Sequence, residues 1–161
     1  MERQIHGFPA VVDRDSRILI LGSFPSVRSR DRAFFYMHPQ NRFWRILTAV
    51  YGDDFHAGSV TEKIVLLQRH GIALYDVIES CDIIGSADAD IRDVIPADIA
   101  DLITGTRITR ILVNGATAYR LFCRYQPALV AMARRMPSTS AANAAQSLDH
   151  LIVTWQKALL E

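Results

Sequence analysis

The sequence predicts an α/β fold in which a parallel β-sheet is covered by helices on both faces. Short apolar segments typical of strands alternate along the chain with longer segments whose apolar residues recur at helical spacing. Half of the 161 residues are apolar and 22% are charged, which is the composition of a globular protein. We find no internal repeat and no linker, and we therefore expect one domain over residues 1–161.

Four segments have the composition of strands. They are RILILG (17–22), IALYDV (72–77), RITRILVNG (107–115) and a weaker one, RRMPSTS (134–140), which runs into a turn. Ligands of parallel α/β folds bind beyond the carboxyl ends of the strands. We therefore expect residues 22–26, 76–78, 114–115 and 137–140 to converge on one cleft.

Five segments have helical periodicity or helix-start signals. They are residues 41–52 with Gly52 as the stop, 59–71, 95–105 with Pro96 in the first turn, 116–126 and the amphipathic 147–161. Ser59 followed three residues later by Glu62 predicts a capping box at the start of the second helix.

Several classes of protein can be set aside. No apolar run reaches the ~20 residues of a membrane span, and the polar N-terminus does not resemble a signal peptide. Two isolated cysteines, Cys81 and Cys123, suit a reducing cytoplasm and cannot hold a four-cysteine cluster. The five histidines lack the spacing of metal ligands, so we expect no metal and no cofactor.

Familiar nucleotide and hydrolase motifs are also missing. There is neither a phosphate-binding P-loop nor the G-x-G-x-x-G of a dinucleotide site. The segment GSFPS (22–26) differs from the G-x-S-x-G of a nucleophile elbow. A triad of Ser23, His38 and Asp76 is conceivable, but nothing in the sequence fixes its geometry.

The charge is distributed unevenly. Residues 17–45 hold six arginines and one acid, a balance of +5, whereas residues 76–101 hold eight acids and one base, a balance of −7. Basic residues beside aromatic residues fit a nucleic-acid backbone. Solvated loop and helix faces would explain the same pattern.

Aromatic side chains concentrate just after the first strand. Phe24, Phe35 and Tyr36 are candidate platforms on which a flat ligand could stack. Each of the three could equally be a core residue, and we assign Phe43 and Trp44, on the following helix, to the core.

Five blocks together resemble the hypoxanthine-DNA glycosylase branch of the uracil-DNA glycosylase superfamily. They are ILILGSFPS, FYMHPQNRFW, GIALYDVIESC, ILVNGATA and MPSTSAANA, in the order of the family and spanning residues 5–155. The resemblance implies a three-layer α/β/α sandwich with a four-stranded parallel sheet. It also implies a monofunctional enzyme that removes a deaminated base, typically hypoxanthine, from DNA.

The resemblance assigns the catalytic role to Asn41, in HPQNRFW. Where uracil-specific relatives carry a carboxylate or amide in the first block, this chain has Phe24, so no titratable base stands there. An amide takes no proton at neutral pH, so Asn41 would orient a water or hold the base edge. Asn41 also directly precedes a predicted helix and could simply be its N-cap.

The remaining site residues follow from the same blocks. We expect a base-binding set of Gly22, Ser23, Phe24, Pro25, Phe35, Tyr36, His38 and Asn114. A DNA-binding set comprises Ser26, Arg28, Arg30, Arg42, Pro137, Ser138, Thr139 and Ser140. His38 could instead be a structural loop residue, Asn114 could fix a turn, and residues 137–140 could be an ordinary polar turn.

The sequence thus predicts a monomeric, cofactor-free DNA glycosylase acting on DNA that contains deaminated bases. No lysine stands in the cleft blocks, so a Schiff-base lyase step is not expected. The alternatives are a non-catalytic module that binds damaged DNA, a glycosylase specific for uracil or mismatches, and an enzyme that cleaves free nucleosides.

Overall fold

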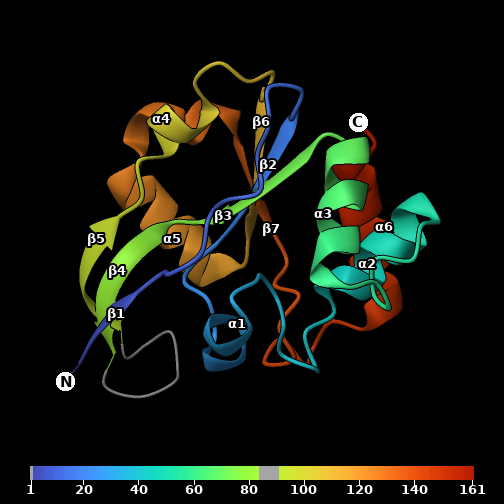
Figure 1. Ribbon diagram of the computed structural model, residues 1–161, viewed down its shortest axis with the longest axis horizontal. Helices are drawn as coiled ribbons and strands as arrows, with labels where there is room; N and C mark the ends of the chain where they lie inside the picture. Colours follow the sequence, from blue (N-terminus) through green and yellow to red (C-terminus); the bar gives the residue numbers. More distant parts are fainter. Residues whose placement is uncertain (1, 84–90) are drawn as a thin grey trace.

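The computed structural model describes residues 2–83 and 91–161, and a four-stranded parallel sheet lies at its centre (Figure 1). The strands are β2 (Ile18–Gly22), β3 (Ile72–Asp76), β6 (Arg110–Asn114) and β7 (Ala133–Met136). Their order in the sheet is β3-β2-β6-β7, and every neighbouring pair is parallel. The predicted sheet is confirmed.

Alternate residues of the central strand supply two separate cores. Ile18 and Ile20 of β2 belong to one buried cluster, and Leu19 and Leu21 belong to the other. Because successive side chains of a strand point to opposite faces, both faces of the sheet are covered. Each fully buried side chain of this kind contributes about 1.5–3 kcal/mol.

Helices from different parts of the chain cover the two faces (Figure 1). The first face packs against α2 (Phe43–Tyr51), α3 (Val60–Arg69) and α6 (Leu148–Leu159). The second packs against α4 (Ile99–Ile103) and α5 (Ala116–Tyr125). This is the predicted three-layer α/β/α sandwich.

Local sequence signals account for several helix ends. The hydroxyl of Ser59 accepts a hydrogen bond from the Glu62 amide, and the Glu62 carboxylate accepts one from the Ser59 amide, both at 3.2 Å, so the capping box is confirmed. Helix α2 ends at Gly52, whose φ of 81° lies in the left-handed region that favours glycine.

One predicted helix start is wrong. Pro96 is the last residue of β5 (Ile91–Pro96), and helix α4 begins only after Asp98, whose carboxylate accepts from the Asp101 amide. Strand β7 ends at Met136 and is followed by a loop over residues 137–140, in agreement with a weak strand that runs into a turn.

Some described elements were not predicted at all. They are helix α1 (Val27–Arg32), a 3-10 helix (Pro127–Met132) and an antiparallel sheet of β1 (Glu2–Ile5), β4 (Ile78–Ile83) and β5. Two acids of the −7 segment, Asp88 and Asp90, lie outside the described residues.

The N-terminal segment runs along β4 and then reaches the edge of β3. Ile5 pairs with Ser80, the His6 amide donates to the Glu79 carbonyl at 2.9 Å, and Val11 forms a bridge with Leu74. This path places the His6 side chain beside the carboxyl end of β3, where the functional site lies. Within residues 2–83 and 91–161, no helix has the length and apolar character needed to cross a membrane.

Candidate active site

A cavity of about 740 Å³ opens at the carboxyl ends of the parallel strands. It is lined by residues 22–30 after β2, by Asp76 at the end of β3, by Asn114 at the end of β6, by residues 138–142 and by Phe35, Tyr36, His38, Gln40 and Asn41. The volume lies within the roughly 300–1,000 Å³ of small-molecule sites. All four predicted strand ends contribute to the cavity, through residues 22–26, Asp76, Asn114 and residues 138–140. Val77, Ile78, Gly115 and Pro137 do not line it, and the Pro137 carbonyl accepts from the Trp155 indole at 3.1 Å.

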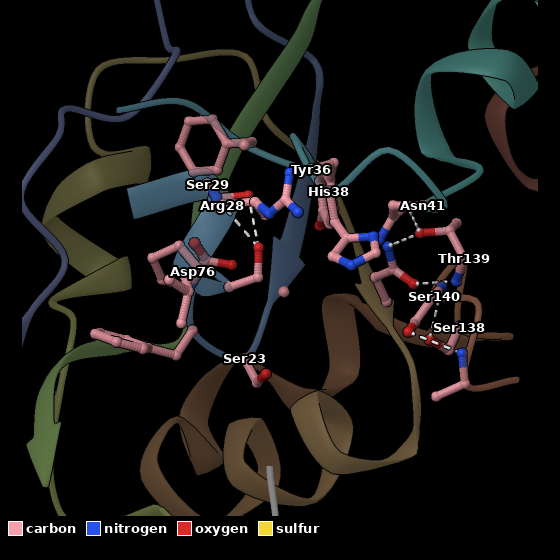
Figure 2. Close-up of a pocket in the computed structure, with 18 of the residues that line it drawn as sticks. Ser23, Arg28, Ser29, Tyr36, His38, Asn41, Asp76, Ser138, Thr139 and Ser140 are labelled. Carbon is pink, nitrogen blue, oxygen red and sulfur yellow. Dashed lines mark hydrogen bonds between the residues drawn. The ribbon is translucent and has the colours of Figure 1, made fainter. Parts of the chain in front are cut away.

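One wall of the cavity is a chain of hydrogen bonds from three separate segments (Figure 2). The Thr139 hydroxyl donates to Asn41 Oδ1 at 2.8 Å and accepts from Asn114 Nδ2 at 3.0 Å. Asn114 Oδ1 also accepts from the Thr139 amide at 3.1 Å. Thr139 is 1% exposed, and its hydroxyl and amide both have partners within the protein, so the geometry gives no support to the predicted contact with DNA phosphate. Its hydroxyl ties Asn41 to Asn114.

The side-chain amide of Asn41 is held by its oxygen alone. Asn41 Oδ1 accepts from the Phe43 amide at 3.0 Å as well as from Thr139. The N-cap residue of α2 is Arg42, so Asn41 is not the N-cap. Asn41 nevertheless accepts a hydrogen bond from one backbone amide of the first turn, that of Phe43. Asn41 Nδ2 donates to none of the described residues and belongs to a side chain that lines the cavity.

Arg42 holds the loop that follows β7. Its guanidinium donates to the carbonyl oxygens of Thr139, Ser140, Asn143 and Gln146. Charge-assisted bonds to four carbonyls use four of the five N–H donors of the guanidinium. The predicted phosphate contact of Arg42 therefore has no support in the geometry.

Ser138 and Ser140 also serve the shape of this loop. Ser138 Oγ accepts from the Ser140 amide at 3.2 Å, and Ser140 Oγ accepts from the Ala142 amide at 3.2 Å. Gly115, with φ of 101°, lets the Ser138 backbone approach, since a Cβ there would lie 3.2 Å from the Ser138 Cβ. Both serines line the cavity, so they remain candidates for contact with DNA.

The aromatic residues divide into wall and core. Phe24 is half-buried, lines the cavity and carries the Arg30 guanidinium 5.4 Å above its ring. Tyr36 stacks on Phe43 with ring centroids 4.1 Å apart. Phe35 is 2% exposed among Phe8 and other rings, so it supports the wall but offers no open face to a base.

Polar groups also meet at the floor of the cavity. A Cβ built on Gly22 would lie 2.5 Å from Asp76 Oδ1 and 3.1 Å from the Tyr36 hydroxyl, so only glycine fits there. Burial and the charge of Asp76 raise the pKa of Tyr36, and the Asn114 amide acts in the opposite direction without forming a hydrogen bond. The Tyr36 hydroxyl is therefore protonated, buried and unpaired within residues 2–83 and 91–161.

A buried pair of His6 and Asp76 was missed by sequence reasoning. His6 Nε2 lies 2.7 Å from Asp76 Oδ2, and the two residues are 1% and 4% exposed. Asp76 had a signal, since it lies near the carboxyl end of a predicted strand. His6 had none, because it lies 70 positions away in a segment without a motif.

Exposed side chains form the rim. His38 is exposed, and its Nδ1 accepts from the Gln40 amide at 3.1 Å, which leaves the neutral ring with its proton on Nε2. Arg28 is exposed at the edge of the cavity. The Ser26 hydroxyl accepts from the Ser29 amide as the N-cap of α1, while Ser23 and Pro25 line the cavity between strand and helix.

The basic segment does not form one patch. Arg17 donates to the His70 carbonyl and lines a second cavity away from the site, and Arg30 donates to Gln4 at 2.6 Å. Arg28, Arg32 and Arg45 are exposed. Neither a solvated face nor a continuous phosphate track describes the whole segment.

Among residues 2–83 and 91–161, no group of three or more His, Cys, Asp or Glu side chains could hold a metal ion. The site instead offers a fixed amide, two aromatic rings and a buried carboxylate around one cavity.

Comparison with known families decides the affiliation. Residues 9–159 match the family model of the uracil DNA glycosylase superfamily. The chain belongs to this superfamily.

Individual relatives agree with this assignment. A protein named hypoxanthine DNA glycosylase from Methanosarcina acetivorans is 34% identical over 85% of this chain and 87% of its own length. Another of the same name, from Methanosarcina barkeri, is 38% identical over 54% of this chain and 55% of that protein. A solution NMR structure of a candidate uracil DNA glycosylase from Methanosarcina acetivorans superposes with a TM-score of 0.80 at 32% identity, covering 95% of this chain and 94% of that one.

Within the superfamily fold, the cavity lies where parallel α/β proteins bind their ligands. Its polar groups come from Asn41 on one wall and Asp76 on the floor, on opposite sides of the space in Figure 2. Superfamily membership makes a base extruded from DNA the natural occupant of this space.

Proposed function

We propose that this protein is a monofunctional DNA glycosylase that removes hypoxanthine from deoxyinosine in DNA, with uracil as a second candidate base. It works as a single domain and as a monomer. The two Methanosarcina relatives named hypoxanthine DNA glycosylase support the base, and superfamily membership supports the reaction.

The observation that carries the proposal is the fixed amide of Asn41. Both hydrogen bonds to this side chain are accepted by Oδ1, so the orientation of the amide is set and Nδ2 is left as a donor at the cavity. Cleavage of a glycosidic bond builds positive charge on the sugar and negative charge on the departing base. A preorganised donor stabilises such a charge, or orients the attacking water, without reorganising during the reaction.

Aromatic side chains in the walls of the cavity can bind an extruded base by stacking. An extruded nucleotide loses the stacking of the helix, at a cost of a few kcal/mol. Stacking on aromatic side chains returns about 1–3 kcal/mol per base. Phe24 and Tyr36 line the cavity and are held by Arg30 and Phe43, which makes them the candidate platforms.

The reaction is simple hydrolysis. The water oxygen bonds to C1′ of the sugar and gives up a proton, the bond to the base nitrogen breaks, and the base leaves with the electron pair and takes up a proton. A lyase step would need an amine nucleophile. No lysine lines the cavity, and Lys63 donates to the carbonyl oxygens of His56 and Gly58.

The test is a release assay on labelled duplexes that each carry one modified base. With deoxyinosine we expect free hypoxanthine and an abasic site that breaks only after alkali, and we expect the same yield in EDTA. The release rates from deoxyuridine and deoxyxanthosine duplexes show how uracil and xanthine compare with hypoxanthine as substrates.

Three results would contradict the proposal in different ways. Strand breaks without alkali would indicate a lyase. Loss of activity in EDTA would indicate a metal. Tight binding to the deoxyinosine duplex without any base release would favour the alternative of a non-catalytic damage-binding module.

A further inference from the structure

A second cavity lies at the opposite edge of the parallel sheet. Its volume is about 460 Å³, and it opens at the amino ends of β2 and β6. The ends of α3 and α6 meet beside it, near the C-terminus (Figure 1). Since a strand rises about 3.3 Å per residue, the five residues of β2 set the two cavities roughly 15 Å apart. The second cavity shares no lining residue with the first.

Three arginines line this second cavity, and the backbone holds them in neighbouring segments. Arg17 precedes β2, and Arg110 begins β6, where its Cα pairs with that of Ile18. The Arg107 amide donates to the Ser16 carbonyl at 3.1 Å, which ties the segment before β6 to the segment before β2. Like charges gathered in this way repel one another, so an anion between them would be stabilising.

The protein itself does not supply that anion. Within residues 2–83 and 91–161, the ion pairs of the structure involve none of the three arginines. Arg110 donates to the carbonyl oxygens of Ala158 and Glu161, and Arg17 donates to the His70 carbonyl at 3.3 Å. The side chain of Arg107 has no hydrogen-bond or ion-pair partner in the described part of the chain.

The lining of the cavity is positively charged overall. Its one acidic residue in the described chain is Glu161, and Arg134, which lies outside the lining, binds that carboxylate at 2.8 Å. Asp53 also lies outside the lining and contacts His70 and Arg69. Three guanidinium groups and one carboxylate leave a formal balance of +2.

Two hydroxyl groups add neutral donors. Burial raises the pKa of Tyr51 to about 12, against the opposing charges of Arg17 and Arg110, so this hydroxyl keeps its proton at neutral pH. The Tyr51 ring stacks on the His70 ring with centroids 4.1 Å apart, which fixes its place in the wall. Neither the Tyr51 nor the Thr109 hydroxyl has a hydrogen-bond partner among residues 2–83 and 91–161.

We propose that this cavity is a second binding site, which takes a phosphate dianion carried by a small phosphomonoester. Guanidinium groups bind phosphate oxygens through charge-assisted, often bidentate hydrogen bonds. A phosphomonoester is largely dianionic at pH 7, because its second pKa is about 6, and a dianion cancels the balance of +2. A carboxylate or a phosphodiester carries one charge and would leave half of that balance. Leu160, an exposed apolar residue of the lining, offers a contact for the organic part.

The experiment measures ligand binding by isothermal titration calorimetry at one fixed, low ionic strength, with Tm recorded on the same samples. The probes are inorganic phosphate, deoxyadenosine 5′-monophosphate and adenosine 3′,5′-cyclic monophosphate. The first two should bind saturably and raise Tm, because a ligand that binds only the folded protein stabilises it. The cyclic compound is a phosphodiester with one negative charge, and it should bind about tenfold more weakly or not at all.

Arg107→Gln is the principal variant, because the lost side chain has no contact in the fold to break. It should weaken phosphate binding by about ten- to a hundredfold and leave Tm without ligand unchanged. Tyr51→Phe should weaken binding by about two- to tenfold. Arg45→Gln is the matched control, since Arg45 is exposed on α2 and lines neither cavity, and it should bind phosphate like the wild type.

The inference does not rest on the proposed function, and base release separates the two. Arg107→Gln should keep the wild-type rate of hypoxanthine release, because the second cavity lies at the far edge of the sheet. A protein that binds phosphate as expected but releases no base would refute the glycosylase and leave this site intact.

Three results would overturn the inference. The first is the absence of saturable binding of phosphate and of the monophosphate at millimolar concentration. The second is wild-type phosphate affinity in Arg107→Gln, which would place the bound anion elsewhere, for example in the active-site cavity. The third is weaker binding of Arg107→Gln to duplex DNA while neither small probe binds, which would show that these arginines contact a DNA backbone instead.

Discussion

Asn41→Asp separates the catalytic from the structural role of Asn41. Both hydrogen bonds that fix the side chain, from the Phe43 amide at 3.0 Å and the Thr139 hydroxyl at 2.8 Å, are accepted by Oδ1. A carboxylate accepts both equally well. The substitution therefore removes only the Nδ2 donor and places a negative charge at the cavity.

The size of each effect follows from these contacts. With both contacts kept, the free energy of unfolding should change by no more than about 0.5 kcal/mol, and Tm by about 1–2 °C. Losing one preorganised donor costs about 10²–10³-fold in rate. Asn41→Ala should show a similar rate loss together with about 1–3 kcal/mol of destabilisation, since the Thr139 hydroxyl and the Phe43 amide lose their acceptor.

The assay is single-turnover release of hypoxanthine at saturating enzyme, with Tm measured on the same samples. Saturation removes the weaker DNA binding that a new negative charge causes. Gln68→Glu, an exposed amide-to-carboxylate change on α3, controls for the added charge itself and should match the wild-type rate. An Asn41→Asp protein with wild-type Tm and wild-type rate would remove Asn41 from the chemistry and refute the reasoning.

Three further predictions test the surroundings of Asn41. Thr139→Val should lower the free energy of unfolding by about 1–3 kcal/mol and the rate of hypoxanthine release by roughly tenfold. Thr48→Val is the control, because it also loses one donated and one accepted hydrogen bond, and it should lose stability but keep the wild-type rate. Equal release rates in the two variants would show that Thr139 does not position Asn41. Gly22→Ala puts a Cβ 2.5 Å from Asp76 Oδ1. It should lower the free energy of unfolding by about 1–3 kcal/mol and remove most of the hypoxanthine release. A wild-type rate and Tm would show that Asp76 can move aside without loss. Arg28→Gln should weaken binding to any duplex and lower the salt slope of log K by about one; an unchanged slope would place the phosphates elsewhere.

The sheet and its helices could be predicted because their signals are local. Apolar runs such as residues 18–21, helical spacing and the Ser59–Glu62 capping box each act within a few residues. The β1-β4-β5 sheet escaped prediction because its strands are short and partly polar and because β1 takes its partner, β4, from a distant segment. Pro96 was misplaced because a proline suits a strand end as well as a first helical turn.

The candidate site was predictable only in outline. Ligands of parallel α/β folds bind beyond the carboxyl ends of the strands. This rule predicted correctly that residues 22–26, Asp76 and Asn114 line the cavity. The inward turn of Thr139 was not predictable, because it depends on partners 25 and 98 positions away. Arg42 was predicted to contact DNA because the four loop carbonyls that accept from its guanidinium are likewise distant in the sequence.

The Asn41 wall and the Asp76 floor of the cavity hold their polar groups in the same way. Asn41 uses its oxygen internally and leaves its nitrogen to the cavity, and Asp76 uses Oδ2 internally and leaves Oδ1. Each anchor, Thr139 or His6, is 1% exposed, so its hold on the polar group is shielded from competing water. Because folding already fixes the orientation of these polar groups, they need not reorient as the transition state forms. We therefore expect the activity to depend on the buried anchors Thr139 and His6 as well as on the groups that they hold.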